Sequence, residues 1–123
     1  MKKIPILFMT VLFLISGFAY AQESGEMAKI QYLISTIETL KGAKFIRNGK
    51  AYEAKTAADH LRRKLTAAND RVKTADDFIE LCASKSSISG LPYQIRFSDG
   101  STMESNVFFR NKLRAFSNLP FHP

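Results

Sequence analysis

Residues 43–53 read AKFIRNGKAYE, and this stretch decides the fold because it predicts a β-hairpin. Two short alternating segments flank the pair Asn48-Gly49. A two-residue hairpin turn needs positive φ at both central residues, and Asn followed by Gly meets that requirement well. We therefore expect antiparallel strands at about residues 43–47 and 50–53.

The segment before the hairpin predicts a helix. Ser24 can cap its start, and Gly42 ends it after about Lys41. Its apolar residues recur at spacings of three and four and so share one face: Met27, Ile30, Leu33, Ile34, Ile37 and Leu40.

Two further helices are expected after the hairpin. Thr56 with Asp59 resembles a capping box and predicts the start of a helix that the pair Asn69-Asp70 breaks or bends. Thr74 with Asp77 predicts a second capped helix. The residues expected to face inward are Ala57, Ala58, Leu61, Leu65 and Ala68 in the first helix, and Phe78, Ile79 and Cys82 in the second.

The last third of the chain predicts a loop, two strands and a helix. Residues 84–92 (SKSSISGLP) are too rich in Ser, Gly and Pro for regular structure. Residues 93–97 (YQIRF) alternate, Asp99-Gly100 supplies a tight turn, and residues 101–104 can pair back. Ser105 should cap a last helix with Phe109, Leu113 and Phe116 inward, and a frayed tail should begin at about residue 118. The sum is a small single α+β domain, with about four helices packed on one face of a small, mostly antiparallel sheet.

The first 21 residues have the pattern of a secretory signal peptide. Lys2 and Lys3 precede an apolar stretch at 4–18, and Ala19-Tyr20-Ala21 places small residues where signal peptidase cleaves. The apolar stretch is shorter than the roughly 20 residues that a membrane-spanning helix needs. We expect cleavage after Ala21 and an exported domain, residues 22–123, that does not span the membrane.

Composition limits the partners of the exported domain. Without residues 1–21 it has 102 residues, of which 16 are basic and 11 acidic, so its net charge is +5. Export removes nucleic acid from reach, and the basic excess favours anionic partners through a long-range, salt-sensitive attraction. The expected partner is an envelope protein or an anionic envelope component, and the oligomeric state stays open.

Few residues in the chain can carry chemistry. Neither His60 nor His122 has zinc-ligand spacing with another ligand, so we expect no metal and no cofactor. The only cysteine, Cys82, falls in the middle of an apolar helix face, which predicts a buried and inert thiol. The serines at 84–89 lack the G-x-S-x-G and S-x-x-K patterns, which favours a turn whose hydroxyls bind its own backbone.

Several motifs occur in a fixed order: FIRNG at 45–49 followed by Tyr52, HLRRKL at 60–65, TADDFI at 74–79 and SKSSISGLPY at 84–93. Together they resemble the YfeK-like family of small exported bacterial proteins, a domain of unknown function. Phe108 stands where that family would place tryptophan. The resemblance implies a periplasmic location in a Gram-negative bacterium and the order of elements given above, and it implies no activity.

Within these motifs lie the candidate binding residues Arg47, Tyr52, His60, Ser87, Ser89 and Tyr93. Three of them, Tyr52, His60 and Tyr93, converge if the hairpin, the second helix and the serine loop meet at one end of the sheet. Our first hypothesis is that this end binds a ligand or protein in the envelope, as a non-catalytic binding or accessory module.

Two alternatives stay open. Ser89-Gly90-Leu91-Pro92-Tyr93 resembles the S-G-x-x-Y loop of periplasmic lysozyme inhibitors, although those are largely β proteins and the positive charge would repel a basic lysozyme. The other alternative is a small serine hydrolase in which His60 activates a loop serine.

Overall fold

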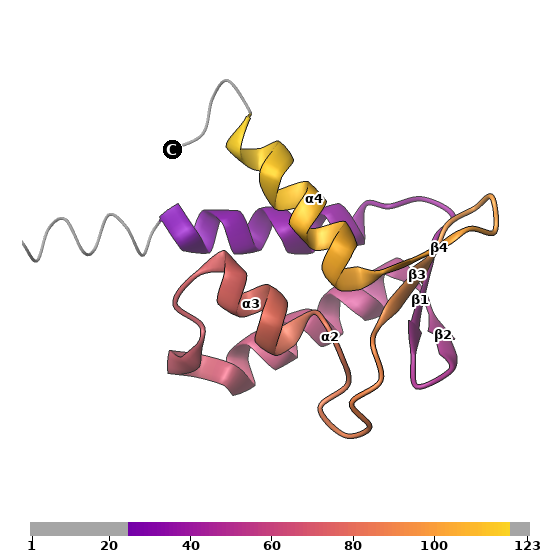
Figure 1. The fold of residues 1–123 in the computed structure, drawn as a ribbon, viewed down its shortest axis with the longest axis horizontal. Helices are drawn as coiled ribbons and strands as arrows, with labels where there is room; N and C mark the ends of the chain where they lie inside the picture. Colours follow the sequence, from indigo (N-terminus) through magenta and orange to yellow (C-terminus); the bar gives the residue numbers. More distant parts are fainter. Residues whose placement is uncertain (1–24, 119–123) are drawn as a thin grey trace, which may run out of the picture.

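The hairpin expected at Asn48-Gly49 is present in the computed structural model, which describes residues 25–118 (Figure 1). Strand β1 (Lys44–Arg47) pairs antiparallel with strand β2 (Lys50–Tyr52). The φ angles are 53° at Asn48 and 77° at Gly49, as the two-residue turn requires. The predicted strands are confirmed to within one residue at each end.

Two more strands complete the sheet. Strand β3 (Gln94–Arg96) pairs antiparallel with β1, and β4 (Thr102–Glu104) pairs antiparallel with β3. The strand order is therefore β2-β1-β3-β4. Because β1 and β3 occupy the centre, Phe45 and Ile95 lie opposite each other and are both buried.

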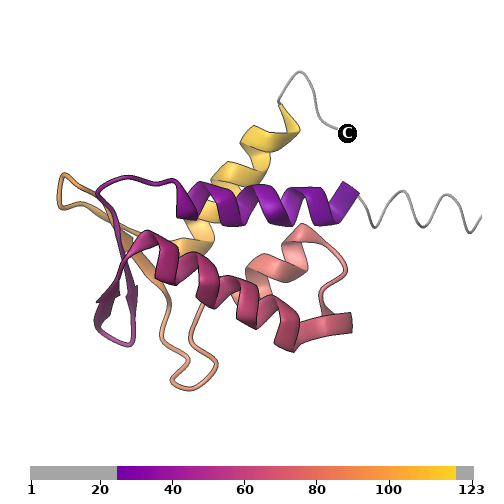
Figure 2. The same cartoon turned by 180° about the vertical axis from the view of Figure 1, so that it is seen from behind.

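The helices of the described part of the chain lie on one side of this sheet (Figure 1), and the view from behind in Figure 2 agrees. This confirms the predicted α+β architecture. None of them is both long and apolar enough to cross a bilayer. The helices are a helix over residues 25–38 (the 25–38 helix), α2 (Ala54–Ala68) with the 3₁₀ turn η1 (Asn69–Arg71), α3 (Ala75–Cys82) and α4 (Ser105–Ser117).

In the described part of the chain, an apolar core lies between the helices and the sheet. Phe78 of α3 and Phe109 of α4 meet edge to face in it, with ring centres 6.2 Å apart, and both are almost completely buried. The predicted inward positions of α2 and α3 are confirmed as buried or half-buried. Other fully buried members are Ile30, Leu33, Ile34, Ile37, Ile79, Cys82 and Ile95.

Met27 is an exception to the predicted apolar face of the first helix, since 46% of its surface is exposed. The start of the 25–38 helix lies against the N-terminus of α3, where the Glu26 carboxylate accepts the backbone N–H of Ala75 at 2.9 Å. Glu26 thus makes the contact with α3 at this end, and the prediction that Met27 faces inward was wrong.

The helix caps follow the sequence prediction in one case out of three tested. Thr74 and Asp77 form the expected capping box at the start of α3. Helix α2 instead begins directly after β2 at Ala54, so Thr56 lies inside the first turn and caps nothing. Helix α4 likewise begins at Ser105, whose buried hydroxyl donates to the carbonyl of Ala83 rather than capping the helix.

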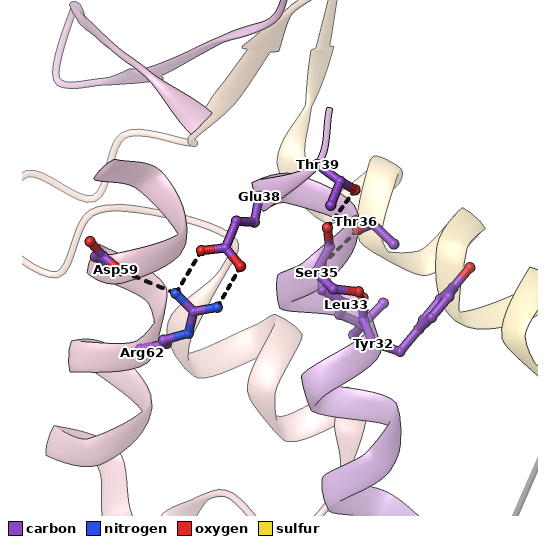
Figure 3. Close-up of polar contacts among 8 residues, drawn as sticks. All are labelled: Tyr32, Leu33, Ser35, Thr36, Glu38, Thr39, Asp59 and Arg62. Carbon is purple, nitrogen blue, oxygen red and sulfur yellow. Dashed lines mark hydrogen bonds and ion pairs between the residues drawn. The ribbon is translucent and has the colours of Figure 1, made fainter. Parts of the chain in front are cut away.

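An ion-pair network joins the 25–38 helix to α2 on the surface (Figure 3). Arg62 of α2 donates to both carboxylate oxygens of Glu38, at 2.9 and 3.1 Å, and to Asp59 at 3.1 Å. Exposed pairs of this kind add little stability. Their consequence for the site is that the Asp59 carboxylate is already bound to Arg62.

The predicted signal peptide at residues 1–21, the Ser24 cap and tail residues 119–123 lie outside the described residues.

Candidate functional site

A cavity of about 140 Å³ lies where α2, the hairpin and the start of β3 meet. Most of its buried lining residues are apolar and form a nonpolar floor, with the buried Ser105 as a polar exception, and most of its exposed or half-buried lining residues are polar and form a rim. The floor consists of Ile37, Phe45, Leu61, Ala83 and Phe109, and the rim of Arg47, Tyr52, Thr56, His60, Arg63 and Gln94. Tyr93 is buried in the wall between them.

Four side chains form a continuous hydrogen-bonded chain along this wall. Nη1 of Arg47 lies 3.0 Å from Nδ1 and 3.2 Å from Nε2 of His60. His60 Nε2 lies 3.2 Å from the Tyr93 hydroxyl, and Lys64 Nζ lies 3.1 Å from the same hydroxyl. Residues from β1, from α2 and from the start of β3 are thereby joined into one wall.

The directions of these hydrogen bonds require a neutral imidazole. A guanidinium can only donate, so His60 must accept from Arg47 through an unprotonated ring nitrogen. Lys64 also only donates, so the Tyr93 oxygen is an acceptor. Two arrangements meet these conditions with a neutral ring: Nδ1 accepts from Arg47 while Nε2–H donates to the Tyr93 oxygen, or Nε2 accepts from both Arg47 and the Tyr93 hydroxyl.

The electrostatic surroundings also keep His60 neutral. Burial, followed by the positive charges of Arg47, Lys64 and Arg63, lowers the pKa of His60 from 6.5 to about 4. A histidine with that pKa carries no charge at neutral pH. It therefore orients Arg47 without adding positive charge to the cavity.

Tyr52 supports Arg47 from the opposite strand of the hairpin. The Arg47 guanidinium lies 5.6 Å from the centre of the Tyr52 ring, within the range of a cation–π contact. Lys50 lies 5.4 Å from the same ring. Both groups that hold Arg47, the Tyr52 ring and the His60 imidazole, are therefore uncharged.

Four of the six candidate residues predicted from the sequence line this cavity: Arg47, Tyr52, His60 and Tyr93. The convergence expected for Tyr52, His60 and Tyr93 is therefore present. Ser87 and Ser89 do not line it. Ser89 is exposed on the loop and hydrogen-bonds to the side chain of Asn48 at the hairpin turn.

Sequence reasoning missed Arg63 and Lys64 as site residues. Lys64 lies one helical turn after His60 on α2, and this i, i+4 spacing was the signal that could have revealed it. Arg63 gave no signal, because it is not among the apolar residues predicted to face inward in α2, and only the position of the hairpin makes it a rim residue.

The serine loop uses its hydroxyls to hold its own backbone. The buried Ser86 hydroxyl accepts the N–H groups of Ile88 and Ser89, and Ser84 donates to the carbonyl of Ile79. In the described residues, no loop serine hydrogen-bonds to His60, whose partners are Arg47 and Tyr93. The sequence interpretation of this segment as a self-satisfied turn agrees with these contacts.

Tyr93 is the last residue of the segment 89–93 that resembles the S-G-x-x-Y loop of lysozyme inhibitors. In that loop Ser89, Gly90 and Leu91 are exposed, whereas only 8% of Tyr93 is exposed because it lies in the cavity wall. Insertion into an enzyme cleft would have to proceed without this tyrosine.

Cys82 is completely buried in the core, as predicted, and burial raises the pKa of its thiol. Thiolates are the reactive form of cysteine, so this environment suppresses reactivity. Within residues 25–118, no three His, Cys, Asp or Glu side chains are grouped so as to hold a metal ion.

These features define a small α+β domain with an apolar cavity and a cationic rim. The chain belongs to a family of unknown function, DUF5329, whose model matches residues 24–117. It is similar to the Uncharacterized protein YfeK of Salmonella typhimurium strain LT2, with 37% identity over 93 residues, covering 76% of this chain and 77% of that protein. No solved structure matches the chain.

Proposed function

We propose that this chain is an exported periplasmic protein whose domain acts as a non-catalytic ligand-binding module of the cell envelope. The observation that carries the proposal is the cavity of about 140 Å³ with its apolar floor and polar rim. Concave apolar sites with a few converging polar groups are the usual form of small-molecule sites in proteins.

The contacts of His60 favour binding over catalysis. A general base must be within hydrogen-bond reach of the proton that it removes. Both ring nitrogens of His60 lie against Arg47 or Tyr93, so the imidazole holds the cavity wall in place. A catalytic dyad would instead pair this imidazole with a nucleophile.

The cavity is tested with three matched probes, namely phenylacetate, 2-phenylethanol and 2-phenylethylamine. We expect at least one of them to shift the amide NMR signals of Ala57, Ala83 and Tyr93 in the mature protein, with an affinity on the order of 1 mM. Ala57→Leu fills the cavity and should abolish the shifts. If no probe shifts these signals in the wild-type protein, the proposed function is wrong.

The control for that variant is Ala67→Leu. Ala67 lies on the same helix α2 but is exposed and does not line the cavity. The substitution adds the same side chain to the same helix, so its effects on helix propensity match those of Ala57→Leu. Ala67→Leu should bind the probes like the wild-type protein.

The proposed export rests on the sequence of residues 1–21, with Lys2 and Lys3 before an apolar stretch and the Ala19-Tyr20-Ala21 site. We expect the protein released from the periplasm by osmotic shock to have the mass of a chain that begins at Gln22. Introducing an arginine by Ala21→Arg should leave the uncleaved chain, because signal peptidase requires a small residue at this position. Full-length protein in the cytoplasmic fraction would contradict the proposal.

A further inference from the structure

We infer that the cavity takes a monoanionic ligand in which a carboxylate is joined to one apolar group about the size of a phenyl ring. The inference rests on the proposed function, because it names the ligand class of the same cavity.

The charge of the lining residues favours an anionic ligand. Two arginines, Arg47 and Arg63, line the cavity, and no aspartate or glutamate does. The nearby carboxylates of Asp59 and Glu53 are bound to Arg62 and Lys44. Within residues 25–118 neither lining arginine forms an ion pair. Two uncompensated cations at the edge of an apolar cavity attract an anion.

The way Arg47 is held favours a carboxylate as the anionic group. Its described hydrogen bonds all use Nη1, and its guanidinium lies over the Tyr52 ring, so uncharged groups hold it in place. The N–H groups on Nη2 and Nε have no partner in residues 25–118, and such a fork matches the two oxygens of a carboxylate.

The size of the cavity suits an apolar group as large as one phenyl ring. A dry apolar cavity of about 150 Å³ is large enough to hold benzene. The cavity here, at about 140 Å³, therefore has room for one ring or a short branched chain. Its buried floor, including Leu61 and Phe109, supplies the apolar surface for such a group.

The test compares dissociation constants of the three phenyl probes at pH 7.5 and low salt. We expect phenylacetate to bind at least tenfold more tightly than 2-phenylethanol, and 2-phenylethylamine to bind more weakly than the alcohol. Equal affinity for the acid and the alcohol would overturn the inference and leave the proposed function standing. Failure of all three probes would remove both.

Substitutions of rim arginines test whether the rim causes the preference for the acid over the alcohol. Arg47→Gln and Arg63→Gln should each reduce the ratio of acid to alcohol affinity at least threefold. Arg63 is exposed, so its substitution leaves the fold intact even if Arg47→Gln does not fold. The matched control is Arg96→Gln, an exposed arginine of β3 that does not line the cavity and should leave the ratio unchanged. An unchanged ratio in both rim variants would overturn the inference.

A carboxylate joined to an apolar group is present both in a free acid and in the C-terminal residue of a peptide. The N-acetylated tripeptide acetyl-Gly-Gly-Phe, which is a monoanion, and its C-terminal amide distinguish these sources. Binding of the tripeptide as tightly as phenylacetate, with a tenfold loss in the amide, supports a peptide C-terminus. Tenfold weaker binding of the tripeptide supports a free acid, and equal binding of the tripeptide and its amide contradicts a carboxylate site.

Discussion

Replacing Phe78 with alanine is expected to lower the free energy of unfolding by about 3–5 kcal/mol, the range typical of buried phenylalanine truncations. Phe78 is completely buried and meets Phe109 edge to face, so the substitution removes a ring from the centre of the core. A domain of this size has about 5–15 kcal/mol of stability in total. Urea denaturation followed by circular dichroism gives the difference.

The matched control lies on the same helix. Leu81 of α3 is 44% exposed, and Leu81→Ala should lower the free energy of unfolding by less than about 1 kcal/mol. If Phe78→Ala does not fold, Phe78→Leu keeps the test possible and should cost about 1–1.5 kcal/mol. Equal losses for the Phe78 variants and Leu81→Ala would mean that the core is not built around this ring.

The second large effect is a loss of stability in acid that depends on His60. The unfolded chain binds a proton at His60 near pH 6.5, whereas the folded protein does so only near its lowered pKa of about 4. The unfolded state therefore holds more protons between these values, and the free energy of unfolding falls as the pH is lowered through this window. At 1.36 kcal/mol per pH unit the upper limit is about 3 kcal/mol, and solvent screening of the half-buried ring reduces it to about 1–2 kcal/mol.

His60→Asn isolates this effect, because asparagine does not titrate and can still accept from Arg47. The free energy of unfolding of both proteins is measured by urea denaturation from pH 7.5 to 4.5. Carboxylates whose pKa values are lowered, such as Glu26 and Asp77, are present in both proteins and cancel in the comparison. The wild-type protein should lose more stability than the variant, and parallel curves would refute the lowered pKa of His60.

Local signals in the sequence predicted most of the fold. Asn48-Gly49 determined the hairpin, and the capping box of Thr74 and Asp77 determined the start of α3. The predicted start of α2 at Thr56 was too late, and Ser105 was wrongly predicted to cap α4. Both errors arose because each helix follows a strand almost directly. The N-cap is a glutamate in both cases, Glu53 just after β2 and Glu104 at the end of β4, and neither forms a side-chain cap hydrogen bond.

The candidate site was predictable in part. Arg47, His60 and Tyr93 were identified as polar residues within motifs, but their contacts span 13 residues between Arg47 and His60 and 33 between His60 and Tyr93. Such contacts depend on how α2 packs against β1 and β3, and no local pattern encodes that packing. The same holds for Ser105, whose hydroxyl bonds to Ala83 across 22 residues.

The central claim is that the cavity binds the apolar part of a small acid while Arg47 and Arg63 bind its carboxylate. The most direct measurement is the set of intermolecular nuclear Overhauser effects between phenylacetate and the mature protein. We predict contacts from the phenyl protons to Tyr52, Leu61 and Phe109, and none to Leu81, which lies on the exposed face of α3. Contacts confined to residues outside the cavity, or no contacts while shifts saturate, would contradict the account.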